Sequence, residues 1–198
     1  ILGDPAIVPY PTTRHLWTSR IGRVAEWFVE TERAQQAIAH PTHFEQMGYG
    51  EIPALGFTLR GKADRIDIDE RGNAHLYDYK TGNAPSAKEQ RHFDKQLLLE
   101  AAMVERGAFR ELQPRHTERA VFVALGSTPK EVPAPLDEVP AAQVWAEFET
   151  LITRWFERDR GYTARAALLK EKDVSDYDHL ARFGEWDVID PADREELE

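Results

Sequence analysis

Two short stretches decide the fold: "GKADRID" at residues 61–67 and "YDYKTG" at residues 77–82. They lie in segments 57–69 and 74–80, which are rich in alternating β-forming residues and are separated by the turn signal "ERGN". The two segments therefore predict a β-hairpin. Both strands carry aspartate or lysine at positions where the inner face of a sheet normally holds apolar side chains, so the charged residues need a physical reason.

The charged residues of the two strands share one face of the predicted hairpin. Side chains alternate across a strand, so Asp64 lies on the same face as Ile66 and Ile68, which marks that face as the core side. Asp78 and Lys80 lie on the corresponding face of the second strand. Any register that keeps the apolar residues together therefore also brings these three charged residues together.

The turn decides which of them are direct neighbours. A turn over residues 69–73 places Asp64 opposite Asp78, and a turn over residues 70–74 places Asp64 opposite Lys80. Directly opposed Cβ atoms lie roughly 5 Å apart. Both registers remain open from the sequence.

Two carboxylates at that separation repel each other unless a cation lies between them or one of them is protonated. A divalent cation such as Mg²⁺ or Mn²⁺ binds oxygen ligands of this kind and keeps water at its other positions. A lysine on the same face can hold a water molecule or a phosphate oxygen, so the set predicts metal-assisted phosphodiester hydrolysis. The alternative interpretation is a cross-strand ion pair at the rim of a sheet.

The rest of the chain predicts a mixed α/β domain. A helix over about 14–39 is expected to end at Pro41, and the turn-rich segment 40–56 is expected to be loop with a short strand. A helix of about twenty residues is expected between a capping box at Ser86 and a stop at Gly107. A buried strand over 119–126, a proline-rich loop over 129–140 and an amphipathic helix follow.

The second predicted helix supplies further candidates for the site. Phe93, Leu97 and Val104 define its apolar face, and Gln96 and Glu100 lie close to that face. A glutamine on an inward stripe needs hydrogen-bond partners, which a polar site at the end of the hairpin would supply. The alternative is a glutamine on the flank of the helix, in contact with solvent.

Composition excludes several classes of function for these 198 residues. The absence of cysteine rules out disulfides, thiolate catalysis and cysteine-held zinc or iron–sulfur sites, and it agrees with a cytoplasmic location. No apolar run is long enough to span a membrane. The net charge of −10 argues against a general binder of polyanions, so any contact with nucleic acid needs local basic residues, metal ions or a partner chain.

The motifs "GKADRID", "YDYKTG" and "KQLLLEAAM" together resemble the RecB-like branch of the PD-(D/E)XK nuclease superfamily. The resemblance implies a restriction-endonuclease-like α/β fold with a mixed central sheet and a catalytic hairpin flanked by helices. It implies a metal-dependent nuclease in which Asp64, Asp78 and the backbone carbonyl of Tyr79 bind Mg²⁺ or Mn²⁺. Lys80 would orient or activate the attacking water, and Gln96 would support the site. An iron–sulfur cluster, which related domains hold with four cysteines, is not expected here.

Two positions depart from the family pattern. The family often has tyrosine four residues after the glutamine, where this chain has Glu100. Many relatives also carry a histidine or glutamate on the first helix that reaches the metal, and Glu26 and Glu30 are the candidates here, although each is also expected as a solvated residue.

Other segments extend the resemblance and suggest how nucleic acid is bound. "RIGRVAEWF" at 20–28 and "DYDHLARFGEW" at 176–186 resemble the nuclease domain of alphaproteobacterial AddB-type subunits, whose AddAB helicase–nuclease complexes process double-strand breaks in DNA. That resemblance implies DNA as substrate and an AddA-like helicase as partner. Lys62, Arg65 and Arg165 are candidate contacts with the DNA backbone.

We expect one nuclease domain over residues 1–198, with a core at about 15–160 and a C-terminal extension at 161–198, as a fragment of a larger subunit. Two other functions remain open from the sequence. One is a nuclease-fold module that binds DNA or a partner subunit without cleaving. The other is a stand-alone nuclease of the same superfamily.

Overall fold

The computed structural model describes residues 10–161, 178–187 and 189–191 of the chain. Contacts between residues divide the chain into two compact units, residues 1–149 and residues 150–198. The first unit contains the predicted hairpin and all of the sheet.

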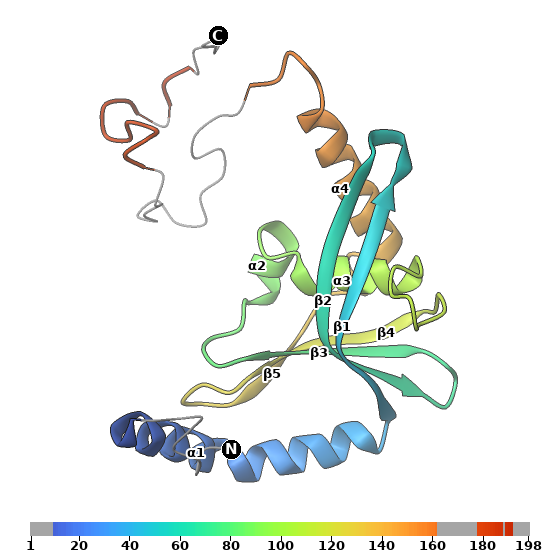
Figure 1. Cartoon of the computed structure of the whole chain (residues 1–198), viewed down its shortest axis with the longest axis vertical. Coiled ribbons are helices and arrows are strands. Elements are labelled where there is room, and N and C mark those ends of the chain that lie inside the picture. The colour runs from blue at the N-terminus through green and yellow to red at the C-terminus, as the bar shows by residue number, and fades with distance from the viewer. Residues whose placement is uncertain (1–9, 162–177, 188, 192–198) are drawn as a thin grey trace. The chain divides into compact units, whose positions relative to one another are not determined.

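A five-stranded mixed sheet forms the centre of the first unit, in the order β1-β2-β3-β4-β5 (Figure 1). Its strands are β1 (Ala39–Ile52), β2 (Phe57–Asp69), β3 (Ala74–Lys80), β4 (Thr117–Ala124) and β5 (Lys130–Pro133). β3 and β4 are parallel, and the other neighbours are antiparallel. The expected α/β fold, a mixed sheet with a hairpin flanked by helices, is confirmed.

Helices cover the two faces of this sheet. The helices are α1 (Pro11–Gln36), α2 (Ala87–His92), α3 (Gln96–Glu105) and α4 (Ala141–Trp155), with a short 3₁₀ turn at Pro53–Leu55. On one face, Trp27 of α1 packs against Tyr77, Val121 and Val123. α3 contacts β3 and β4 and is buried along almost its whole length, so the core lies between α3, the sheet and α1.

The turn between β2 and β3 sets the register of the hairpin. Arg65 pairs with Tyr77 and Ile68 pairs with Ala74, which is the register of a turn over residues 69–73. The Asp69 carboxylate closes the turn by accepting hydrogen bonds from the backbone N–H groups of Arg71, at 2.9 Å, and Asn73, at 2.8 Å. Of the two registers that the sequence left open, the structure has the one that directs Asp64 toward Asp78.

The other face of β2 carries a buried ion-pair cluster. Arg65 is 3% exposed and donates two hydrogen bonds to Asp67, at 2.6 and 2.5 Å, and one to Glu32 of α1 at 2.5 Å. It also donates to the Tyr79 hydroxyl at 3.1 Å and lies over the ring of Tyr77. The cluster joins α1 to the hairpin. The Arg65 guanidinium is therefore held by internal partners, and the contact with DNA expected for it stays a prediction.

β1 corrects the expectation of a loop over 40–56. The strand runs through Pro41, where a register shift against β2 occurs, and α1 ends earlier, at Gln36. Gly48 and Gly50 look like turn residues in the sequence but lie inside the strand, where a Cβ atom would come within 2.6 Å of Phe109 and 2.5 Å of Trp145. They allow aromatic side chains to pack closely on the strand. β5 was also missed, within the expected loop at 129–140.

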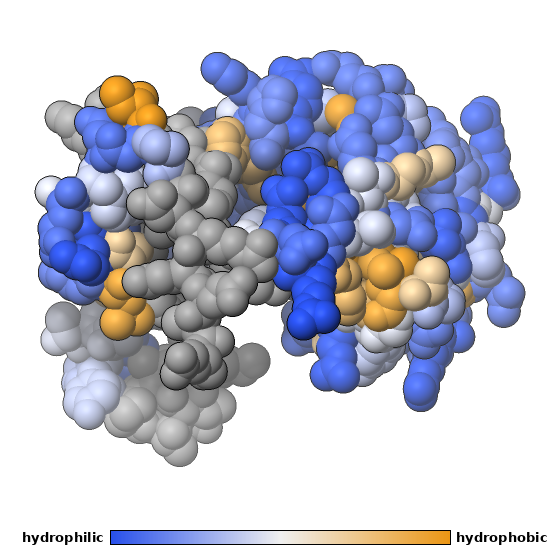
Figure 2. Space-filling model, turned by 90° about the horizontal axis from the view of Figure 1, so that it is seen from above, coloured by the Kyte–Doolittle hydropathy of each residue, from blue (hydrophilic) through white to orange (hydrophobic). Residues whose placement is uncertain are grey.

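The described surface is largely hydrophilic. On the face shown in Figure 2, apolar side chains occur in small separate groups outside the grey atoms.

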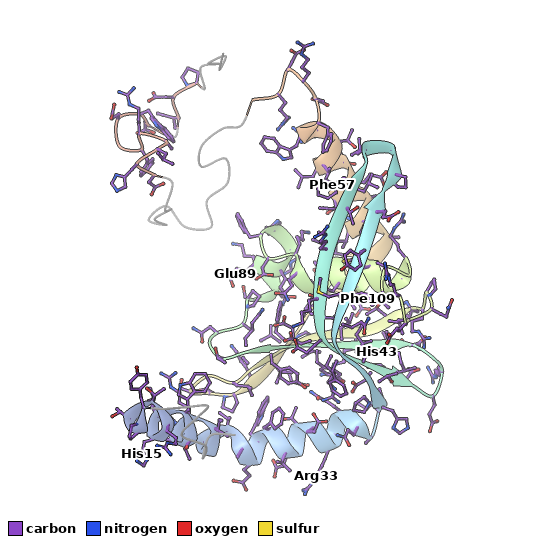
Figure 3. All side chains as sticks on the ribbon, in the orientation of Figure 1. His15, Arg33, His43, Phe57, Glu89 and Phe109 are labelled. Carbon is purple, nitrogen blue, oxygen red and sulfur yellow. The ribbon has the colours of Figure 1, made fainter. Side chains whose placement is uncertain are left out.

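β1 and β2 form a long antiparallel pair, the β1–β2 arm. At the end of this arm where β2 begins, Phe57 packs against Phe148 of α4, with ring centroids 6.0 Å apart (Figure 3). Within the described residues, the structure contains no helix with the length and apolar character needed to cross a bilayer.

Gly72 tests the turn. Its φ of +86° favours glycine, and a Cβ atom there would meet nothing within 4 Å, so the cost of a side chain is purely conformational. We expect Gly72→Ala to lower the free energy of unfolding by about 1 kcal/mol in urea titrations. Gly22 in α1 is the matched control because it also has open space, and Gly22→Ala should stabilise by up to about 1 kcal/mol. Equal effects at both sites would contradict this account.

Arg65→Ala tests the buried cluster. It leaves Asp67, which is 0% exposed, without its cationic partner, and we expect the free energy of unfolding to fall by about 3–5 kcal/mol. Lys62→Ala on the same strand removes an exposed ion pair with Glu45 and should leave the urea midpoint close to that of the parent. A parental midpoint for Arg65→Ala would show that the cluster does not hold α1 to the sheet.

Candidate active site

The hairpin opens at the end away from its turn. Pairing between β2 and β3 extends only as far as Arg65 and Tyr77, so Asp64 does not form the direct pair with Asp78 that the register alone predicts. The Asp64 carboxylate instead accepts a hydrogen bond from the backbone N–H of Tyr79 at 3.0 Å. A carboxylate thus replaces the missing strand partner at the point where the two strands separate.

Three polar side chains meet beside Asp64, on the α3 face of β3. Lys80 Nζ lies 2.8 Å from Asp78 Oδ2 and donates to Gln96 Oε1 at 2.9 Å. Gln96 Nε2 donates to Asp78 Oδ1 at 2.5 Å. The Asp78 side chain is 5% exposed and that of Lys80 is 33% exposed, so the carboxylate is shielded while the ammonium group faces accessible space. The lysine also lies over the ring of Phe122.

A break in the expected long helix positions Gln96. The capping box at Ser86 and Glu89 is present, but α2 ends at His92 and a new helix, α3, begins at Gln96. Phe93, expected on the apolar face, lies at the break and is 46% exposed. Asp94 accepts a hydrogen bond from the backbone N–H of Gln96 at 3.3 Å and so supports the new start. As the first residue of α3, Gln96 reaches both Lys80 and Asp78.

Glu100 lies one helical turn after Gln96 and belongs to the same cluster. Its carboxylate accepts a hydrogen bond from Gln96 Nε2 at 3.2 Å, and the residue is 5% exposed. Burial raises the pKa of Glu100 to about 7, with the negative charges of Asp78 and Asp64 adding to the rise and the Gln96 hydrogen bond opposing it. The sequence raised this residue as a departure from the family pattern, and the structure brings it to the candidate site.

The arrangement fits a divalent cation held by few protein ligands. Asp78 Oδ2 is buried and makes no hydrogen bond, although the Lys80 ammonium group is close. Asp64 lies beside it, and both are hard oxygen donors of the kind that Mg²⁺ and Mn²⁺ prefer. Within the described ranges, no three histidine or acidic side chains are grouped to hold a metal ion. Any ion bound here would therefore take most of its ligands from water and substrate, as Mg²⁺ commonly does.

Four other candidates lie away from this cluster or outside the described residues. Lys62 is half exposed and forms an ion pair with Glu45 across the β1–β2 arm. Glu26 and Glu30 are exposed on α1, and no hydrogen bond or ion pair with the cluster is recorded for either. Arg165 lies outside the residues that the structure describes.

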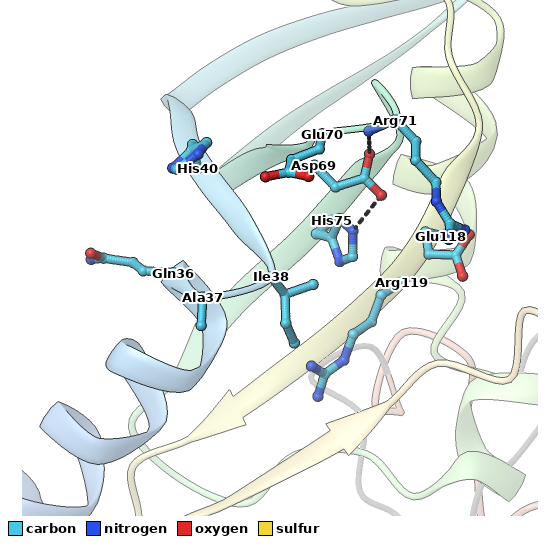
Figure 4. Close-up of a pocket in the computed structure, with 10 residues that line it drawn as sticks. All are labelled: Gln36, Ala37, Ile38, His40, Asp69, Glu70, Arg71, His75, Glu118 and Arg119. Carbon is cyan, nitrogen blue, oxygen red and sulfur yellow. Dashed lines mark hydrogen bonds and ion pairs between the residues drawn. The ribbon is translucent and has the colours of Figure 1, made fainter.

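A cavity of about 610 Å³ lies at the other end of the hairpin, beside the turn between β2 and β3 (Figure 4). Asp69 and His75 line it together with residues of α1 and β4. The Asp69 carboxylate is already used in closing the turn and contacts His75 at 3.4 Å. Asp64, Asp78 and Lys80 do not line this cavity, so it is not the candidate active site.

The chain belongs to the PD-(D/E)XK nuclease superfamily, whose family model matches residues 3–177. The family uses a divalent metal ion as a rule, and its fold implies a nucleic-acid substrate. The superfamily assignment made from the three motifs is thus confirmed. The assignment to AddB-type subunits is not shown by any of the comparisons.

Two curated relatives match part of the chain. "Uncharacterized protein RC0550" of Rickettsia conorii is 27% identical over 100 residues, and an "Uncharacterized protein" of Rickettsia bellii is 26% identical over 100 residues. Each match covers 49% of this chain and 12% of the relative's own length. A solved structure titled "Crystal structure of SSO0001" is 18% identical, with 74% of this chain and 64% of that chain covered at a TM-score of 0.35.

Glu100→Gln tests the electrostatics of the cluster. Because the pKa of Glu100 rises from 4.5 to about 7 on folding, the folded state binds more protons in that interval and stability falls as the pH rises. In EDTA, between pH 5 and pH 8, the glutamine variant should gain roughly 3 kcal/mol in unfolding free energy relative to the parent. Glu111→Gln, at an exposed position, is the control. Parallel pH profiles for parent and Glu100→Gln would contradict the assignment.

Proposed function

We propose that this chain is a metal-dependent deoxyribonuclease module that hydrolyses phosphodiester bonds. The observation that carries the proposal is the meeting of Asp64, Asp78, Lys80 and Gln96 at the open end of the hairpin. Members of one superfamily can lose activity, but this chain retains the two aspartates and the lysine of the motif, Asp64, Asp78 and Lys80. The complete set favours an enzyme over a binding module.

Each residue has a distinct proposed role. Asp64, Asp78 and the carbonyl of Tyr79 would hold Mg²⁺ or Mn²⁺. The bound metal supplies Lewis-acid stabilisation of the phosphate and a water of lowered pKa. Lys80, with its partly exposed ammonium group, orients the attacking water and stabilises charge that develops on the phosphate oxygens. Water adds to phosphorus as the bond to one sugar oxygen breaks, leaving one phosphate monoester and one hydroxyl end.

Gln96 and Glu100 act through the other residues. The side-chain oxygen of Gln96 accepts a hydrogen bond from the Lys80 ammonium group, and its Nε2 donates one to the Asp78 carboxylate, so both are fixed before substrate binds. Outer contacts of this type commonly contribute 10–100-fold in metal affinity or activity. Glu100 buries a third carboxyl group beside the acidic pair, and a bound cation would favour its charged form.

The wider role is proposed from the AddB-like segments at 20–28 and 176–186. We propose that the module works in double-strand break repair, cleaving a strand delivered by an AddA-like helicase subunit in the cytoplasm. Support comes from the small fraction, 12%, of each Rickettsia relative that the match covers, which is what a module within a large protein would show. Co-purification of the full-length protein with a helicase subunit would test this role separately from the chemistry.

Lys80→Ala tests the nuclease. We expect the parent to cleave end-labelled single-stranded DNA with Mg²⁺ or Mn²⁺ and not with EDTA, and the variant to lose about 10²-fold or more in rate. Lys88→Ala, an exposed lysine on α2, is the matched control and should cleave like the parent. A folded parent without metal-dependent cleavage would contradict the proposal for the isolated chain, and a fully active Lys80→Ala would overturn the site.

A further inference from the structure

A second cavity, of about 330 Å³, lies at the end of the parallel strands next to the candidate site. Arg20 and Arg23 of α1 line it, together with the loop 81–83 that follows β3 and the loop 125–127 that follows β4. The two loops lie close together: a Cβ atom on Gly126 would be 3.4 Å from the carbonyl oxygen of Gly82.

The two arginines are available for a ligand. They are three residues apart on α1 and therefore lie on one side of the helix. Within the described residues, neither makes a hydrogen bond or an ion pair, whereas Arg65, Arg91 and Arg119 are each paired with a carboxylate. Among the described residues that line the cavity, none is acidic. In a chain with a net charge of −10, this is a local concentration of two cationic side chains.

The loops add hydrogen-bond donors to the charge. In the described part of the chain, no hydrogen bond uses the backbone N–H groups of Gly82, Asn83, Gly126 or Ser127. The side chains of loop 81–83 and of Ser127 add hydroxyl and amide groups to the lining. Two guanidinium groups and free amide donors, without a carboxylate, form a set that complements a phosphate oxyanion.

The cavity begins one residue after Lys80 along the chain, and Lys80 itself does not line it. Thr81, which lines it, is the residue after Lys80, and consecutive Cα atoms are about 3.8 Å apart. Lys80 pairs with Ala124, and the backbone N–H of Leu125 donates to the Lys80 carbonyl at 2.7 Å, so the lysine and both loops lie at one edge of the sheet. A nucleic-acid strand that presents one phosphate to Lys80 would place a neighbouring phosphate close to this cavity.

We infer that Arg20, Arg23 and the loops 81–83 and 125–127 bind a phosphodiester group of the substrate strand that flanks the cleaved one. The inference rests on the proposed nuclease function and assigns α1 a part in substrate binding, through arginine rather than through the glutamates expected from the family. Contacts of this kind position the strand and do not read its sequence.

The first test is binding of a dT20 oligonucleotide by fluorescence anisotropy in EDTA, at several salt concentrations. Arg20→Ala/Arg23→Ala should weaken binding about tenfold or more. It should reduce the slope of log K against log salt by about 0.7, the contribution of one phosphate contact on a single strand. The matched control is Arg33→Ala/Arg110→Ala, which removes the same charge from exposed sites, one of them near the C-terminal end of α1 (Figure 3).

A large loss in the first double variant with near-parental binding in the control supports the site. Equal losses in both double variants would show a general charge effect and overturn it. Parental binding by Arg20→Ala/Arg23→Ala would also overturn it, while Lys80→Ala in the cleavage assay would still decide the nuclease independently.

A second measurement does not depend on nuclease activity. Titration with inorganic phosphate, followed by amide NMR, should shift the Gly82 and Gly126 resonances in the parent and not in Arg20→Ala/Arg23→Ala. If DNA is not cleaved but these shifts occur, the anion site stands and the proposed function fails. If phosphate leaves both resonances unmoved in a folded parent, the inference is wrong.

Discussion

The register of the β2–β3 hairpin is the constraint on which the rest of the structure depends. The turn closed by the Asp69 carboxylate and Gly72 fixes which residue of β2 faces which residue of β3. A shift of one residue would exchange the two faces of β2, moving Asp64 toward α1 and Arg65 toward α3. The candidate site and the attachment of α1 would then be lost together. A turn far from the chemistry therefore controls its geometry.

Because side chains alternate along a strand, the motif at residues 61–67 contributes to both faces of β2. In "GKADRID", Asp64 and Ile66 face α3, while Arg65 and Asp67 face α1 in the buried ion-pair cluster. A buried arginine with a bidentate carboxylate partner is geometrically demanding, and removing either partner leaves a costly unpaired charge. The same strand thus holds a polar site on one face and positions a helix on the other. The position of α1 in turn brings Arg20 and Arg23 to the loops that follow β3 and β4.

Local patterns predicted some parts of the molecule and misled at others. The strands of the hairpin and the capping box at Ser86 follow from alternation and from side-chain hydrogen bonds within a few residues, so short windows of sequence contain them. The segment that holds Gly48 and Gly50 was expected to be a loop. The two glycines are instead needed inside a strand, because aromatic rings from distant segments pack closely on it. The break before Gln96 was missed because apolar spacing continues across it, and the contacts that favour the new helix start lie in the folded protein.

Three motifs of the sequence were sufficient to assign the superfamily. Residue type and the period of two along a strand predicted the hairpin and placed the candidate residues Asp64, Asp78 and Lys80 on one face of it. Three features follow from the packed fold alone: Arg65 is buried, Glu100 joins the cluster with a raised pKa, and two arginines of α1 line a cavity with the loops that follow β3 and β4. The physical reason is that burial and electrostatic environment arise from segments distant in the chain. The local periodicity of the sequence does not specify how those segments pack against one another.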